Sequence, residues 1–156
     1  MLDKVDFPLT TSQISEFILE KEYTTYFKLQ ETLAEMEHSG LLRVETTHNR
    51  TLYHLTDNGL DTIQYFKNKI SPAIQRDIDE FLKEKKYDLK EEVSVKSDYY
   101  LNTNHEYEVC CQIVENGFSL IDLKLTVPTE SEAEAIAGNC ASQSQDIYTL
   151  LLTKLL

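Results

Sequence analysis

Glycine, cysteine and long apolar runs are all scarce in this sequence. Its 156 residues include four glycines and three cysteines. Four glycines leave little room for a phosphate-binding loop, and neither G-x-S-x-G nor H-E-x-x-H occurs. No run approaches the roughly 18 apolar residues that a membrane-spanning helix needs. The start of the chain lacks a basic region followed by an apolar block, so we expect a cytoplasmic protein.

The cysteines make no C-x-x-C pair, and two of them, Cys110 and Cys111, are adjacent. We expect all three to be small buried apolar residues rather than a disulfide framework, with a redox or ligand role as the alternative. His105 is near Cys110 in sequence. If His105 opens a strand, however, the two side chains lie roughly 17 Å apart along it, which excludes direct pairing. We therefore expect no enzyme activity, no catalytic residue, no cofactor and no metal.

Basic residues are also few, because 15 Lys and Arg stand against 27 Asp and Glu, a net charge of -12. Residues 1–70 hold seven basic and eleven acidic side chains, and residues 71–156 hold eight and sixteen. A nucleic-acid binder usually carries a basic patch, since counterion release supplies much of its affinity. DNA binding would therefore require a local patch, a dimer or a weak interaction.

Helical signals dominate the first 86 residues. Residues 1–7 are too short for a full first helix, so we expect either that the sequence starts late or that residues 2–5 are the tail of a longer helix. Residues 9–22 predict a helix with a Thr10 capping box, and residues 25–39 predict a second, ended by Gly40. Residues 41–55 predict a two-stranded hairpin. Helices are expected from Thr56 to about Lys69 and from Pro72 to about Lys86.

The apolar pattern changes from helical to period two at Glu92. Three antiparallel strands are predicted, with turns at 102–104 and 116–117. A long helix, which Gly138-Asn139 can bend or interrupt, is expected from Thr129 to the C-terminus. The fold class is therefore α+β. We expect one domain at residues 1–86 and a βββα dimerisation or sensing domain at residues 87–156. The apolar C-terminal residues predict cover by a second chain or by the first domain.

Two stretches resemble the bacterial winged helix-turn-helix regulators. They are LxxxLxxMExxGLL, which begins at Leu29, and YHLTDNG at 53–59, with a polar hairpin between them. The whole chain is similar to an uncharacterised family of bacterial winged-helix proteins, a domain of unknown function, through DFPLT, residues 23–27 and residues 53–59. The resemblance implies an N-terminal winged helix-turn-helix, binding to double-stranded DNA and a regulatory role. It supplies neither an operator nor an effector ligand.

In that arrangement, residues 25–39 form the recognition helix and the hairpin forms the wing. The residues expected to contact DNA are Thr25, Tyr26, Lys28, Gln30, His48, Asn49 and Arg50. Glu31 and Glu35 lie on the same predicted face, where carboxylates are repelled by phosphate. Alternatively, the helix residues of this set only form a solvated helix face. The three residues at the hairpin tip would then form only a simple turn. The alternative function is a protein-interaction module that has lost DNA binding.

Overall fold

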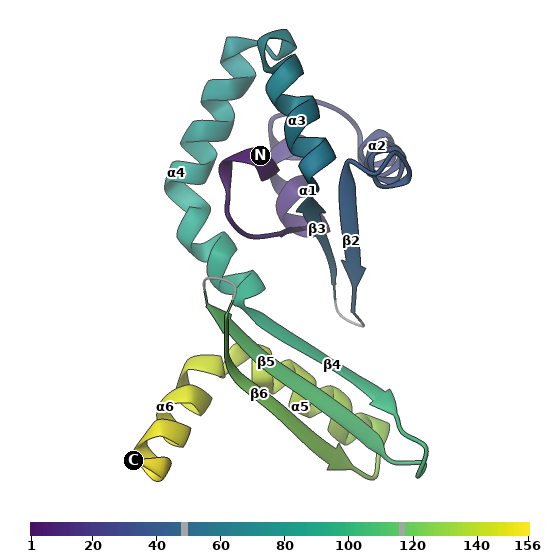
Figure 1. Cartoon of the computed structure of the whole chain (residues 1–156), viewed down its shortest axis with the longest axis vertical. Helices are drawn as coiled ribbons and strands as arrows, with labels where there is room; N and C mark the ends of the chain where they lie inside the picture. The colour runs from purple at the N-terminus through teal and green to yellow at the C-terminus, as the bar shows by residue number, and fades with distance from the viewer. Residues whose placement is uncertain (48–49, 116–117) are drawn as a thin grey trace. The chain divides into compact units, whose positions relative to one another are not determined.

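The computed structural model describes residues 1–47, 50–115 and 118–156, and it has a mixed α+β fold with two three-stranded antiparallel sheets (Figure 1). The chain divides into two compact units. The first comprises Met1–Thr46 and Arg50–Val93, and the second contains Ser94–Leu156. The domain boundary predicted after Lys86 lies inside a helix of the first unit. That helix continues beyond Lys86.

The first unit begins with a 3₁₀ turn, η1 (Leu2–Lys4), followed by the short strand β1 (Leu9–Thr10). The helices α1 (Thr11–Glu20) and α2 (Tyr26–His38) come next. The predicted capping box is confirmed, because Thr10 accepts from the Gln13 backbone and the Gln13 side chain accepts from Thr10 N–H. The prediction that residues 9–10 are helical is wrong. Leu9 pairs across the sheet with Tyr53, a contact that no local pattern reveals.

The predicted hairpin is confirmed as β2 (Leu42–Thr46) and β3 (Thr51–Leu55). β1 adds a third strand, so the sheet order is β1-β3-β2. Gly40 precedes the hairpin with φ +69°, the left-handed conformation expected at the end of α2. Gly59 is required for a different reason. A Cβ at Gly59 would lie 2.2 Å from the carbonyl oxygen of Leu41, so only glycine permits this close approach.

Three helical segments complete the first unit: α3 (Asp57–Phe66), the 3₁₀ turn η2 (Lys67–Lys69) and α4 (Pro72–Ser94). Thr56 caps α3 as predicted, accepting from the Gly59 backbone at 3.0 Å. The predicted end of the last helix near Lys86, and the predicted strand from Glu92, are wrong. Leu89 and Val93 are both buried and lie one helical turn apart, so the buried side of α4 continues to the end of the helix.

The first unit has one contiguous core. Leu9 and Phe17 are essentially inaccessible to solvent, and they pack with side chains from α2, the sheet and α4. The ring of Phe17 packs 5.1 Å from that of Phe81 and 5.8 Å from that of Tyr23, centroid to centroid. Met1, Leu2, Val5 and Phe7 also pack against this core. The N-terminal residues therefore contribute apolar cover, although they form only one 3₁₀ turn rather than the tail of an α-helix.

The second unit is built on β4 (Val95–Leu101), β5 (Tyr107–Glu115) and β6 (Phe118–Val127), a meander in the order β4-β5-β6 (Figure 1). This confirms the three predicted strands. Two helices follow, α5 (Glu130–Ser142) and α6 (Ser144–Leu155). The single long C-terminal helix is therefore a wrong prediction. The break is at Gln143, with φ -119° and ψ 20°, whereas Gly138 and Asn139 lie within α5.

The expectation that the cysteines form no disulfide is also wrong. Cys111 of β5 is bonded to Cys140 of α5, with their Cα atoms 6.2 Å apart and a sequence separation of 29. Cys110 is the free, half-buried neighbour on the opposite face of β5. The bond forms because α5 packs on the inward face of the sheet and brings Cys140 against Cys111 and Val95.

Candidate functional site

The residues predicted to contact DNA at the start of α2 lie together on its first turn. Thr25 is the N-cap, and its hydroxyl accepts from the Lys28 backbone at 3.5 Å. Tyr26 is 51% exposed and Lys28 is exposed. The Lys28 ammonium donates to Glu31 at 2.8 Å. That hydrogen bond raises the pKa of Lys28 and lowers the pKa of Glu31, so both groups are charged at neutral pH and largely offset each other.

Gln30 differs from its predicted outward position. Its side chain is half-buried, and within the described residues its Nε2 atom is buried without a hydrogen-bond partner. Phe27, which the sequence interpretation missed, is 84% exposed on the same turn. Its ring lies edge-on to that of Tyr26, with centroids 6.0 Å apart. Its position outside the Leu29, Leu33 and Met36 series was the available signal.

The hairpin residues are arranged differently from the prediction. His48 and Asn49 lie outside the described residues. Arg50 is half-buried, and its Nη1 group donates to the backbone carbonyl of Glu92 near the end of α4. Loss of hydration lowers the pKa of Arg50, and the charge of Glu92 opposes this shift. In this structure Arg50 therefore joins the hairpin to α4.

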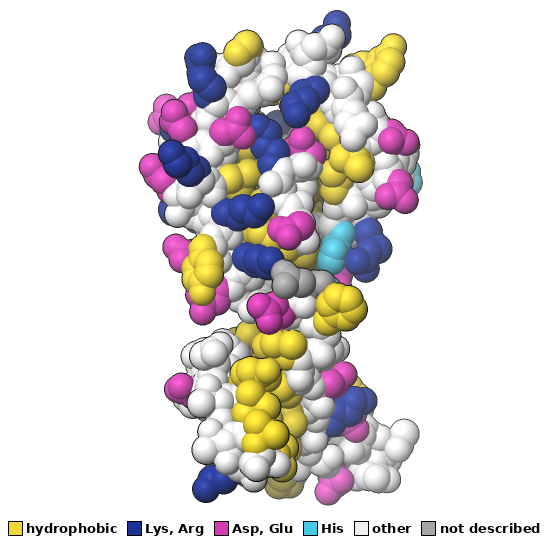
Figure 2. All heavy atoms as spheres, turned by 60° about the vertical axis from the view of Figure 1, so that its left-hand side comes forward, with side chains coloured by type: hydrophobic (Ala, Val, Ile, Leu, Met, Phe, Trp, Pro, Cys, Tyr) yellow, Lys and Arg dark blue, Asp and Glu magenta, His cyan; other side chains and the backbone are white. Residues whose placement is uncertain are grey.

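Basic and acidic side chains are intermixed on the surface of the first unit. On α2, Lys28 is accompanied by the exposed carboxylates of Glu31 and Glu35. On α4, Lys85 pairs with Glu16, and Lys86 and Lys90 approach Asp6 at 3.9 Å and 3.7 Å. Figure 2 shows the same intermixing, with acidic side chains between the basic ones on the face that it presents. The positive potential available on that face is therefore local rather than continuous.

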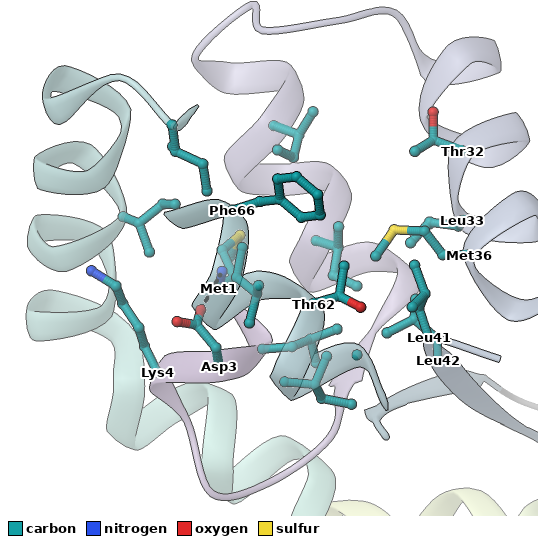
Figure 3. Close-up of a pocket in the computed structure, with 18 of the residues that line it drawn as sticks. Met1, Asp3, Lys4, Thr32, Leu33, Met36, Leu41, Leu42, Thr62 and Phe66 are labelled. Atoms are coloured by element: carbon teal, nitrogen blue, oxygen red, sulfur yellow. Dashed lines mark ion pairs between the residues drawn. The ribbon is translucent and has the colours of Figure 1, made fainter. Parts of the chain in front are cut away.

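A cavity of about 350 Å³ lies on the inner side of α2 (Figure 3). Side chains from α1, α2, α3, α4 and the N-terminal residues surround it, most of them apolar. They include Leu2, Phe17, Leu29, Leu33, Met36, Phe66, Ile74 and Ile78. The same helix thus turns its capped, partly aromatic first turn to solvent and its apolar side to this cavity.

Most of the polar side chains around the cavity have protein partners. The hydroxyl of Thr32 donates to the Lys28 carbonyl at 2.8 Å, and that of Thr62 donates to the Asn58 carbonyl at 2.7 Å. Gln75 donates to the Ile70 carbonyl at 2.9 Å, and Lys4 pairs with Asp79. The cavity is therefore suited to a neutral, apolar molecule.

Among the described residues, no group of three or more His, Cys, Asp and Glu side chains is close enough to hold a metal ion. His105 does not open a strand as supposed, because it lies in the turn before β5 with φ +62°. Cys111 is held in the disulfide. None of the described helices combines the length and the apolar character needed to cross a membrane.

Residues 1–155 match the model of a family described as Domain of unknown function (DUF4364), and the chain belongs to that family. No curated protein and no solved structure matches the chain. The matched residues include both units.

Proposed function

We propose that this member of the DUF4364 family is a transcriptional regulator that binds double-stranded DNA through a winged helix-turn-helix in its first unit. The observation that carries the proposal is the exposed first turn of α2, the second helix of a helix pair that is followed by a hairpin. A helix-turn-helix protein contacts bases and phosphates with this part of its second helix. Thr25, Tyr26 and Lys28 supply hydroxyl and ammonium donors there.

The protein is proposed to act as a homodimer. Two copies of α2 would meet half-sites about one helical turn of DNA apart, and the dimer would double the few basic contacts. The wing contributes less in this arrangement than the sequence suggested, because Arg50 is engaged by the Glu92 carbonyl. No catalytic step is proposed.

A protein-interaction module is the second candidate, and one observation favours it. The exposed Phe27 and Tyr26 lie beside the carboxylates of Glu31 and Glu35, on a chain with net charge -12. Exposed aromatic side chains are typical of protein interfaces, whereas carboxylates beside phosphate are repelled. The two functions differ in salt dependence, since apolar association does not weaken as salt is added.

The test is binding of the purified full chain to DNA from upstream of its own gene and to scrambled DNA, each at two salt concentrations. We expect sequence-specific, salt-sensitive binding. Lys28→Ala should weaken it several-fold and reduce the salt slope by about one, because one phosphate contact is lost.

Lys85→Ala is the matched control, since it also removes a lysine that pairs with a glutamate, in the same unit but outside α2, although Lys85 is only half-exposed. If Lys28→Ala and Lys85→Ala lose the same amount of DNA affinity, the proposed contact between the first turn of α2 and DNA is wrong. Absence of binding even at low salt would overturn DNA binding itself and leave the interaction module.

A further inference from the structure

The strand β6 forms an edge of the second sheet and is long for an edge strand. It spans ten residues, and among the described residues it pairs with β5 only. The other side of such a strand presents a row of backbone N–H and C=O groups, which can pair with a strand of another chain. Proline, which would prevent such pairing, is missing between Phe118 and Val127.

The inward side chains of β6 are incompletely covered. α5 lies over β4 and β5, where Val95, Val109 and Cys111 are buried. On β6, by contrast, Leu125 is 46% exposed and Ile121 is only half-buried, although both lie on the inward face. α6 has no buried residue, and its Leu150 and Leu155 are exposed. Figure 2 shows a continuous column of hydrophobic side chains on one face of this unit.

We propose that a second copy of this chain covers this surface by pairing its β6 antiparallel with the first, about a two-fold axis through Leu123. Leu123 would then lie opposite Leu123 of the other copy, and Ile121 opposite Leu125. The two inward faces join into one apolar row, and α6 is the element expected to lie over it. On the outward face, Asp122 of each copy meets Lys124 of the other.

Charge complementarity selects this register. Asp122 and Lys124 are both exposed, and they lie on the outward face opposite Gln112 and Cys110 of β5. Within the sheet Lys124 also pairs with Glu108 at 3.3 Å and Asp122 accepts from Gln112 at 3.4 Å, so contacts to a second copy would add to these. Moving the axis to Asp122 would place two aspartates opposite each other, and moving it to Lys124 would do the same with two lysines. Like charges directly opposite each other are destabilising, whereas opposite charges attract. An axis between residues would set the inward face of one copy against the outward face of the other.

The other edge strand provides a comparison. β4 carries Lys96 and Asp98 with the same spacing, so its charges alone could also match those of a second copy. Its inward side chains Val95 and Ser97, however, are already buried, and the Ser97 hydroxyl donates to the Ala137 carbonyl of α5 at 2.7 Å. Pairing through β4 would therefore gain little apolar burial. β6, in contrast, has both uncovered apolar side chains and charges that match those of a second copy.

The experiment measures the molar mass of the full chain in solution by light scattering and analytical ultracentrifugation at micromolar concentration. The unmodified chain is expected to be a dimer. Asp122→Lys and Lys124→Asp each create two like-charge contacts, so each should raise the dimer dissociation constant roughly tenfold or more. An equimolar mixture of the two variants restores opposite charges at both contacts and should form a heterodimer with near-original affinity.

Lys96→Asp on β4 is the matched control and should leave the dimer intact. A monomeric unmodified chain would overturn the proposal. So would weakening by Lys96→Asp but not by Lys124→Asp, or failure of the mixed variants to associate while each keeps the circular dichroism of the original chain. The dimer supports the proposed mode of DNA binding, but it is measured without DNA, so either proposal can fail alone.

Discussion

The two units differ in how they bury apolar surface. The first has a single core in which Phe17 and Leu9 are nearly inaccessible to solvent. The second has two small buried groups, Val95 with Cys111 and Cys140, and Val109 with two alanines. A sheet covered by one short helix buries little apolar area, and burial is the main favourable contribution to folding. The first unit is therefore stabilised by packing, and the second by a cross-link and, as we propose, by a second copy.

The largest expected effect tests the packing of the first unit. Phe17→Ala removes a side chain that is 1% exposed and contacts the rings of Tyr23 and Phe81. It should lower the free energy of unfolding by about 3–5 kcal/mol, because apolar burial is lost and a cavity remains. Urea unfolding measures the loss. Hydrogen exchange should show reduced protection of backbone amides in residues 1–93, while the amides of β5 keep their protection. Equal loss of protection in β5 would contradict the division into two units.

A smaller effect is expected from removing the cross-link of the second unit. Cys140→Ala abolishes the disulfide that closes a loop of 29 residues, and it should lower the free energy of unfolding by about 2–4 kcal/mol. Urea unfolding without a reductant gives the value. Cys110→Ala is the matched control, because Cys110 is free and lies on the other face of the same strand. If both variants behave alike, the disulfide does not support this unit.

The smallest effect concerns the cavity of the first unit. Thr62→Val replaces a hydroxyl beside apolar side chains with a methyl group, and it should raise the free energy of unfolding by about 0.5 kcal/mol. Thermal unfolding detects the change. Thr153→Val is the control, because its hydroxyl makes the same bond one turn back, to Thr149, but on an exposed helix. If Thr153→Val stabilises the protein and Thr62→Val does not, the surroundings of Thr62 are not apolar.

The candidate site was only partly predictable from the sequence. The exposed first turn of α2 follows from Thr25 as a cap and from the apolar series that begins at Leu29. The burial of Gln30 could not be predicted, since it depends on neighbouring elements. The contact of Arg50 with the Glu92 carbonyl joins residues that are 42 positions apart, and the cavity is surrounded by several segments distant in sequence.

The sequence by itself determined the features that depend on neighbouring residues. Thr10, Thr25, Thr56 and Thr129 cap helices, Gly40 ends α2, and period-two alternation gives the strands of the second sheet. These features follow from backbone hydrogen bonding within a few residues. Only the tertiary structure decided the pairing of β1 with β3, the extension of α4 to Ser94 and the bond between Cys111 and Cys140. Each of these depends on a partner distant in the chain, whose approach is set by packing.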